Sequence, residues 1–232
     1  VAVLVGALML RQPAPPDTSY ATSLGERRSL QLSDGTRVDL DTDSALRVQY
    51  NGDERRITLD KGRAFFRVAH EKRPLRVLSD GSSVRAVGTQ FEVFRQDGAI
   101  DVALFEGRVE LQSTRPNGNP DAVLATLGPG QKARIAGNQV SFSQDPVQAG
   151  GLPDWLSGRL VFNDTPLSAA IREFNRYSSQ PIVLETPQLG QYRISGVFRS
   201  DAADGFVEAL HAVYGIRSQR TAEGAYLLQE KR

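Results

Sequence analysis

The 232-residue sequence contains no cysteine, two histidines, one methionine and one tryptophan. Without cysteine the chain has no disulfide, no thiolate metal site and no cysteine nucleophile, although such a chain suits an oxidising compartment as well as a reducing one. The segment His70–Pro74 lacks the second histidine of the HExxH zinc motif. His211 falls beside the apolar stripe of a predicted helix, and we interpret it as structural.

The motifs of phosphate, dinucleotide and acyl-transfer chemistry are also missing: there is no P-loop, no GxGxxG fingerprint and no GxSxG elbow. The net charge is +1, which gives no global field to attract nucleic acid, and aromatic residues make up only 7% of the chain. The sequence therefore predicts no catalytic residue, no cofactor, no metal and no nucleic-acid partner.

Residues 1–10 carry no charge, and as a helix they would cover about half of a ~30 Å hydrocarbon core. We expect the C-terminal end of a truncated transmembrane helix, with Arg11 near the interface; a core strand or an N-terminal remnant are the alternatives. Residues 11–23 are rich in proline, which predicts an extended linker between a membrane and the rest of the chain.

Residues 24–143 consist of short alternating runs separated by turn dipeptides such as Asp34-Gly35. The turns are unevenly spaced, which argues against a fixed-period solenoid. We predict an all-β antiparallel sandwich or roll. Residues 86–94, AVGTQFEVF, form one of these strands, and Gly88 in its middle indicates a bulge, a turn out of the layer or a close backbone approach.

A second pattern begins after the Pro- and Gly-rich residues 144–158, which we interpret as a linker with Trp155 packed at its junction. Residues 159–232 contain two strand–helix–strand units. Thr165 and Pro166 are suited to start the first helix, and Gly215 to end the second. These features predict a small α+β domain built as a β-α-β repeat.

Two charged segments suggest binding but have simpler explanations. Asp39, Asp41 and Asp43 resemble the start of a calcium loop, but Ser44 replaces the required glycine and Tyr50 the final glutamate. A solvated strand face is the favoured interpretation. Residues 55–85 hold nine Lys or Arg and three Asp or Glu, which suits an acidic partner or anionic lipid, or only a solvated β surface.

The β segment resembles the FecR family through LSDGTRVDLDTDSALRV, ITLDKGRAFFRVAHEKRPLRV, VRAVGTQFEV and VALFEGRVEL followed by LGPGQKA. The C-terminal segment, from about Arg159, resembles the short N-terminal-type domain shared by secretins and TonB-dependent receptors. This resemblance implies the periplasmic part of a single-pass inner-membrane regulator. Its partners would be the signalling domain of an outer-membrane TonB-dependent receptor of the iron-siderophore type, and an extracytoplasmic-function sigma factor reached through a cytoplasmic segment that this sequence lacks. Periplasmic and intramembrane proteases would end the signal.

Exposed strand edges in the small domain would suit β-augmentation by the receptor. The predicted partner-binding residues lie on two such strands: Ile194, Gly196, Val197, Phe198, Tyr226 and Leu228. A second set is predicted only to hold the β sheet together: Gly88, Thr89, Phe91, Glu106 and Gly107. A glycan- or peptidoglycan-binding module and a secretin-like assembly subunit remain alternatives.

Overall fold

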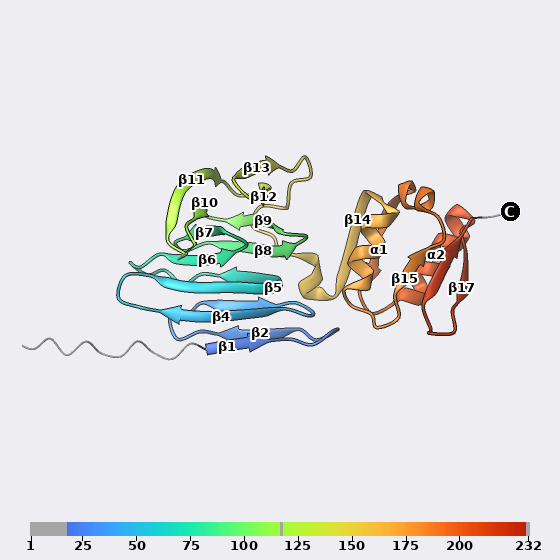
Figure 1. Cartoon of the computed structure of the whole chain (residues 1–232), viewed down its shortest axis with the longest axis horizontal. Coiled ribbons are helices and arrows are strands. Elements are labelled where there is room, and N and C mark those ends of the chain that lie inside the picture. Colours follow the sequence, from blue (N-terminus) through green and yellow to red (C-terminus); the bar gives the residue numbers. More distant parts are fainter. Residues whose placement is uncertain (1–17, 117, 231–232) are drawn as a thin grey trace, which may run out of the picture.

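The computed structural model describes residues 18–116 and 118–230 (Figure 1). It consists of a large β domain, from Thr18 to Phe142, and a smaller C-terminal domain, from Arg159 to Gln229. The predicted membrane-helix end, residues 1–10, lies outside the described residues. No helix in the described ranges is long and apolar enough to cross a membrane. The C-terminal end of the predicted spacer, residues 11–23, overlaps the first strand.

Thirteen strands of the β domain belong to one hydrogen-bonded network, so the predicted mostly-β character is confirmed. Their bounds are β1 (Thr18–Ala21), β2 (Arg28–Gln31), β3 (Arg37–Leu40), β4 (Ala45–Tyr50), β5 (Arg55–Arg67), β6 (Leu75–Ser79), β7 (Ser82–Ala86), β8 (Gln90–Gln96), β9 (Ala99–Glu106), β10 (Val109–Thr114), β11 (Pro120–Leu127), β12 (Lys132–Ala136) and β13 (Gln139–Phe142). The main path runs β11-β10-β7-β6-β5-β8-β9-β12-β13. The pairings are antiparallel except that β5 and β6 run parallel, which the sequence did not predict.

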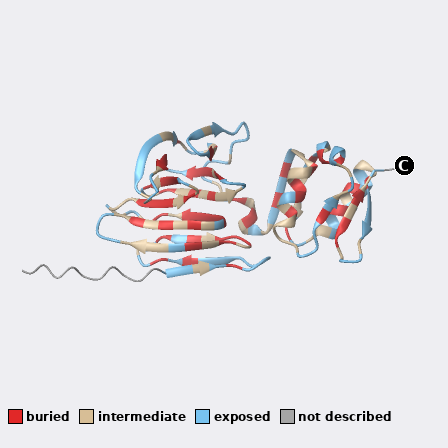
Figure 2. Ribbon diagram, in the orientation of Figure 1, coloured by how far each residue is buried: buried red, intermediate tan, exposed pale blue. Residues whose placement is uncertain are grey.

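Strand β5 connects the two halves of this network. Its first part pairs with β4 and β6, and its second part pairs with β3 and β8. The change of partners falls at Gly62, where φ is +79° and an added Cβ would lie 2.0 Å from the Ser44 hydroxyl. A side chain at this point would collide with the neighbouring backbone, so only glycine fits. Figure 2 shows the buried residues concentrated along β5 and its neighbours.

The core between these strands is mostly leucine, isoleucine and valine. Phe66 on β5 and Phe91 on β8 stack with ring centroids 5.1 Å apart. Both rings are fully buried. Since β5 contributes residues to both halves of the core, the halves cannot separate without exposing apolar surface to water.

Gly88 marks a corner instead of the middle of a strand. The predicted continuous strand is two strands, β7 and β8, and residues 87–89 redirect the chain between their different partners. Gly88 has φ +61°, and the His70 ring lies where its Cβ would be. Gly107, which follows Glu106 at the end of β9, packs against Thr89 at the same corner. A Cβ added to Gly107 would lie 2.8 Å from the Thr89 methyl group.

The C-terminal domain is a small α+β unit, as predicted. Its elements are β14 (Arg159–Pro166), α1 (Leu167–Asn175), β15 (Ile182–Leu184), the 3-10 helix η2 (Pro187–Gln191), β16 (Arg193–Arg199), α2 (Ala203–Tyr214), β17 (Arg217–Arg220) and β18 (Tyr226–Gln229). β14 and β16 form a two-stranded antiparallel sheet, and β15, β18 and β17 form a three-stranded one. Phe174 and Phe206, from the two helices, stack 4.2 Å apart in the core. The proposed internal repeat stays a prediction.

The helix ends agree only in part with expectation. Gly215 caps α2 with φ +68°, as predicted. Thr165 does not cap α1: it lies in β14 and its hydroxyl donates to the Asn163 carbonyl. Helix α1 begins at Leu167 with Pro166 in the capping position and no side-chain cap, because β14 continues through residue 166.

We expect Gly88→Ala to lower the free energy of unfolding by about 1–3 kcal/mol, because alanine is strained at positive φ and its methyl group meets the His70 ring. Urea unfolding followed by Trp155 fluorescence measures this. The double variant His70→Ala/Gly88→Ala keeps the strain but removes the collision, and should regain part of the loss. Equal stability of Gly88→Ala and the parent would contradict the assignment of this corner.

Candidate functional site

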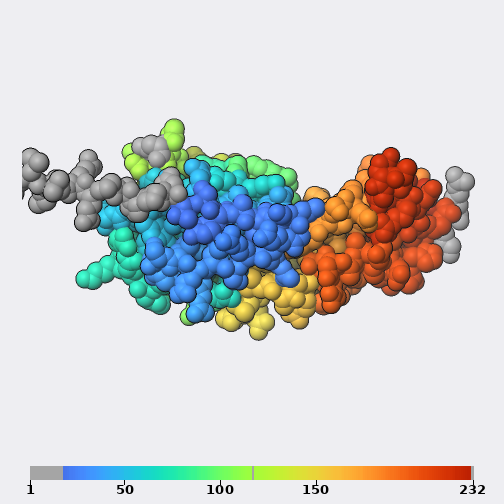
Figure 3. Space-filling model, turned by 90° about the horizontal axis from the view of Figure 1, so that it is seen from below, coloured from blue at the N-terminus to red at the C-terminus, as the bar shows by residue number. Residues whose placement is uncertain are grey.

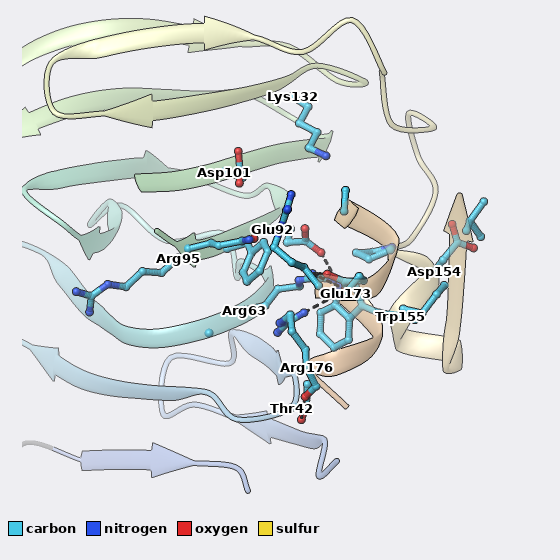
Figure 4. A pocket seen from close by; sticks show the side chains of 18 of the residues that line it. Thr42, Arg63, Glu92, Arg95, Asp101, Lys132, Asp154, Trp155, Glu173 and Arg176 are labelled. Atoms are coloured by element: carbon cyan, nitrogen blue, oxygen red, sulfur yellow. Dashed lines mark hydrogen bonds and ion pairs between the residues drawn. The ribbon is translucent and has the colours of Figure 1, made fainter. Parts of the chain in front are cut away.

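The two domains meet at a polar interface beside a cleft of about 1490 Å³ (Figure 4). The cleft is lined on one side by the middle of β5 and by residues of β8, β9 and β12, and on the other by α1 and the first half of β14; residues 146–155 of the connecting segment also contribute. Figure 3 shows the two lobes joined at a narrower waist. Among the described residues, the ion pairs that join the two domains are Arg63–Glu173 and Arg176–Asp41, and both lie at this interface.

Two carboxylates and two guanidinium groups form the centre of this interface. Asp41, after β3, is completely buried and accepts hydrogen bonds from the Tyr177 hydroxyl at 2.9 and 3.1 Å. It also pairs with Arg176 at 3.1 Å. Glu173 on α1 accepts from Arg63 on β5 at 2.7 and 2.9 Å, and pairs with Arg176 at 3.2 Å. Each of these four charged side chains therefore pairs with an opposite charge from the other domain.

The charges keep one another ionised despite burial. Burial alone would raise the pKa of Glu173, but the charges of Arg63 and Arg176 and their hydrogen bonds outweigh it, so the pKa lies below its usual value. Burial also raises the pKa of Tyr177, and nearby Asp41 and Glu173 raise it further. Tyr177 is therefore a neutral hydrogen-bond donor at physiological pH.

Phe94 on β8 completes the interface. The Arg63 and Arg176 guanidinium carbons lie 4.3 and 4.5 Å from its ring centroid. Such cation–π contacts favour a guanidinium more than a hydrated ammonium group. A hydrogen bond to the backbone also joins the two domains: the Thr42 hydroxyl donates to the Arg176 carbonyl at 3.0 Å.

The predicted linker, residues 144–158, contributes a second contact. It contains the 3-10 helix η1 (Asp154–Ser157). Trp155 packs against Phe65 and Phe105 of the β domain and donates from its indole nitrogen to Glu92, while Arg27 donates to its carbonyl. The predicted packing of Trp155 is confirmed. Its contacts fix where the C-terminal domain begins relative to the β domain.

The aspartates of the DLDTD segment serve different purposes from those expected. Asp39 pairs with Arg67 and Asp43 with Lys61, on the partly exposed surface. Asp41 is buried at the interface, so the prediction of a solvated strand face is wrong for this residue: the C-terminal domain covers it. No group of three or more possible metal ligands occurs in residues 18–116 and 118–230.

The basic excess of residues 55–85 is partly internal. Arg55 is fully buried and pairs with Asp34 at 2.7 Å. Arg76 is buried beside Glu54 at 3.0 Å, and Arg63 belongs to the interface. The interpretation as a uniformly solvated surface is therefore wrong for these three arginines, because acidic residues distant in sequence neutralise them inside the protein.

The predicted partner-binding residues fall on strands of different accessibility. Val197 on β16 is 62% exposed, and β16 has a neighbour on one side only. Ile194 is buried and Phe198 packs on the core, while Gly196 pairs with Phe162 of β14. Strand β18 is not an edge: it lies between β15 and β17, so its backbone is paired on both sides.

Tyr226 and Leu228 accordingly belong to the core, at 6% and 0% exposure. The prediction that residues 226–229 form an open edge is wrong because β15 adds to β18 in parallel, a pairing between distant segments that the local pattern does not reveal. The structure brings Gly88, Thr89 and Gly107 together at one corner, while Phe91 lies in the core beside them.

Sequence reasoning missed the interface residues Arg63, Glu173 and Arg176. Glu173 lies on α1 and Arg176 follows directly after it, three residues further along the chain, and this spacing ordinarily indicates a surface pair. The available sequence signal for these residues was a helix with alanine and leucine in its apolar stripe and charged residues next to that stripe. This pattern does not identify the residues with which the charges pair.

Comparison with known proteins agrees with this architecture. The family description "FecR protein" matches residues 18–110, and "FecR, C-terminal" matches residues 159–225. Two crystal structures of a provisionally assigned anti-sigma factor from Parabacteroides distasonis ATCC 8503, at 2.50 and 1.65 Å resolution, are similar to the chain with TM-scores of 0.76. Both are 25% identical to it, over 94% and 93% of this chain and all of the other. No curated protein matches the chain.

The β domain and the small α+β domain thus each match a FecR family description. The chain belongs to the FecR family, which is of the anti-sigma-factor type.

We expect Asp41→Asn to lower the free energy of unfolding by about 2–4 kcal/mol, since buried Arg63 and partly buried Arg176 would lose one of their counter-charges. The same variant should loosen the domains and speed proteolysis within residues 144–158. Urea unfolding and limited chymotrypsin digestion, which can cut after Trp155 or Leu156, measure the two effects. Asp43→Asn, which removes an exposed pair with Lys61, is the control and should change little.

The interface should also weaken in acid. The pKa of Glu173 is lowered in the folded chain, so its stabilising contribution is complete above the ordinary glutamate pKa of 4.5 and is lost as pH falls through the folded-state pKa. The difference in unfolding midpoint between the parent and Glu173→Gln should therefore be largest near pH 7 and shrink toward pH 3. Exposed Glu208→Gln should show no such trend; a constant difference for Glu173→Gln would refute the assignment.

Proposed function

We propose that this chain is the periplasmic signal-receiving region of a FecR-like transmembrane regulator. It binds the signalling domain of an outer-membrane TonB-dependent receptor of the iron-siderophore type and relays the signal across the inner membrane to an extracytoplasmic-function sigma factor. Membership of the FecR family supports the regulatory role. The periplasmic location, the inner-membrane anchor at residues 1–10 and the receptor partner are proposals.

One observation carries the proposed receptor contact: the β14–β16 sheet has only two strands, and both outer edges lack a neighbouring strand among the described residues. Val161 and Val197 lie opposite each other on its outer face and are 47% and 62% exposed. An open edge beside an apolar face is suited to strand addition by a partner. Ile194, Gly196, Val197 and Phe198 belong to this sheet, whereas Tyr226 and Leu228 would act only by supporting the domain's core.

The domain interface supports the relay. A receptor docked on the C-terminal domain would act on α1. Glu173 on α1 pairs with Arg63 on β5, and Arg176, directly after α1, pairs with Asp41, directly after β3. A displacement of one domain is then transmitted to the other, because breaking these contacts would leave buried charges unpaired. Cleavage by periplasmic and intramembrane proteases would follow, with the spacer of residues 11–23 as the accessible segment. The sigma factor would bind a cytoplasmic segment beyond this sequence.

Two alternative functions can be tested with the same protein. A glycan- or peptidoglycan-binding module needs exposed aromatic platforms, but Trp155 is buried at the interface. A secretin-like assembly subunit would form rings in a concentration-dependent manner. The argument for this function is the resemblance of the C-terminal domain to the short domain of secretins.

We expect the full 232-residue chain to bind the periplasmic signalling domain of the TonB-dependent receptor encoded nearest its gene, saturably and one to one. Isothermal titration calorimetry measures binding, and light scattering records the oligomeric state. A folded chain that binds neither this signalling domain nor those of the other receptors in the same genome would refute the receptor proposal. Ring formation would support the assembly subunit, and binding to peptidoglycan fragments the glycan module.

A further inference from the structure

The two edges of the β14–β16 sheet have different surroundings. Four consecutive residues of β14, Arg159 to Phe162, line the interdomain cleft, whereas no residue of β16 does. Successive side chains of a strand point to opposite faces, so consecutive residues line one cavity only where the cavity lies along the strand's edge. The cleft therefore follows the unpaired edge of β14.

The hydrogen-bond register identifies the free backbone groups at this edge. Ser200 donates to the Gly158 carbonyl at 2.9 Å, which makes this pair a hydrogen-bonded one. Because such pairs alternate in an antiparallel ladder, the N–H and C=O groups of Arg159 and Val161 point away from β16, toward the cleft. Neither N–H group has a hydrogen-bond partner in the described structure. By the same alternation, the N–H group of Val197 points to the other edge of the sheet.

The walls of the cleft carry a surplus of positive charge. Eight Lys or Arg and six Asp or Glu line it. Most of them are paired, but Lys132 on β12 and Arg172 on α1 make no ion pair within 4 Å in the described ranges. Asp97, exposed in the turn between β8 and β9, is the one lining carboxylate with neither an ion pair nor a side-chain hydrogen bond there. Figure 4 shows Lys132 extending from the β-domain wall above the interface cluster.

We propose that an extended, acidic segment of the receptor's signalling domain adds to β14 as a third strand, inside the interdomain cleft. Its backbone would pair with Arg159 and Val161, and carboxylates on its α1-facing side would lie near Arg172, opposite Lys132. The segment would contact both domains at once, because β12 forms the other wall. This inference rests on the proposed receptor function and adds the edge, the backbone register and the charge of the ligand.

A pair of proline variants tests the edge. Val161→Pro removes a donor at the β14 edge, and Val197→Pro removes the corresponding donor at the β16 edge; neither donor belongs to the β14–β16 ladder, so both variants should keep the sheet. We expect Val161→Pro to weaken binding of the signalling domain by about tenfold or more, and Val197→Pro to change it less than about twofold. Circular dichroism and Trp155 fluorescence confirm folding.

Charge reversal provides an independent test that leaves the backbone intact. Arg172→Glu should weaken binding and reduce its dependence on ionic strength, because a favourable charge in the cleft becomes repulsive. Arg37→Glu reverses an exposed arginine on β3 that does not line the cleft and should bind like the parent. Equal effects of the two reversals would overturn the charge assignment.

The outcomes separate this inference from the receptor proposal. Loss of binding in Val197→Pro but not in Val161→Pro would assign docking to β16, and parental binding by both would exclude strand addition; either result overturns the inference and leaves the receptor function standing. If the parent does not bind any signalling domain, an eight-residue peptide of alternating valine and glutamate is the second probe. If this peptide binds the parent but not Val161→Pro, and a valine–lysine peptide does not bind, the result would support the β14 edge as an acceptor of acidic strands without supporting the receptor function. If the valine–glutamate peptide does not bind the parent, the inference is overturned.

Discussion

The arrangement of the whole molecule depends on a carboxylate that is buried completely between two domains. An isolated charge in that position would be strongly unfavourable, so Asp41 is tolerated only while Arg176 and Tyr177 are in contact with it. The same geometry brings Glu173 onto Arg63 and places both guanidinium groups over Phe94. Burial of charge adds little net stability, but it penalises every other orientation of the domains, because each would leave one of these ions unpaired away from water.

The β domain provides a rigid support for this interface through one long strand. β5 has buried arginines in both of its parts: Arg55 is held by Asp34, and Arg63 by the C-terminal domain. Between them Gly62 lets the strand change partners against Ser44 without breaking. The core of the β domain and the interface with the C-terminal domain thus depend on the same stretch of backbone, which explains how the sheet positions a second domain without a disulfide.

Local sequence pattern was enough to predict the mostly-β domain, the small α+β domain, the packing of Trp155 and the conformational demand at Gly88. These features depend on alternation, turn glycines and neighbours close in the chain. It failed where contacts link distant segments. The parallel pairing of β15 with β18 turned a predicted edge into a central strand, and the burial of Asp41, Arg55 and Arg76 depends on partners that single-sequence periodicity does not identify. The interface residues Glu173 and Arg176 have an ordinary surface spacing, so only the three-dimensional arrangement distinguishes them.

The attachment of the first strand gives the molecule a defined mechanical response. β1 pairs with β4 alone, and immediately after it the Thr22 hydroxyl donates to the Asp41 carbonyl and accepts from the Ser44 amide at 3.0 Å, while the Asp43 amide donates to the Ser23 carbonyl. Tension applied at Thr18 is therefore carried first by one four-residue ladder and next by the loop that contains Asp41. Peeling β1 away would load that loop before any strand of the central core yields. A pull on the N-terminal side of the chain is therefore transmitted to the interface between the two domains.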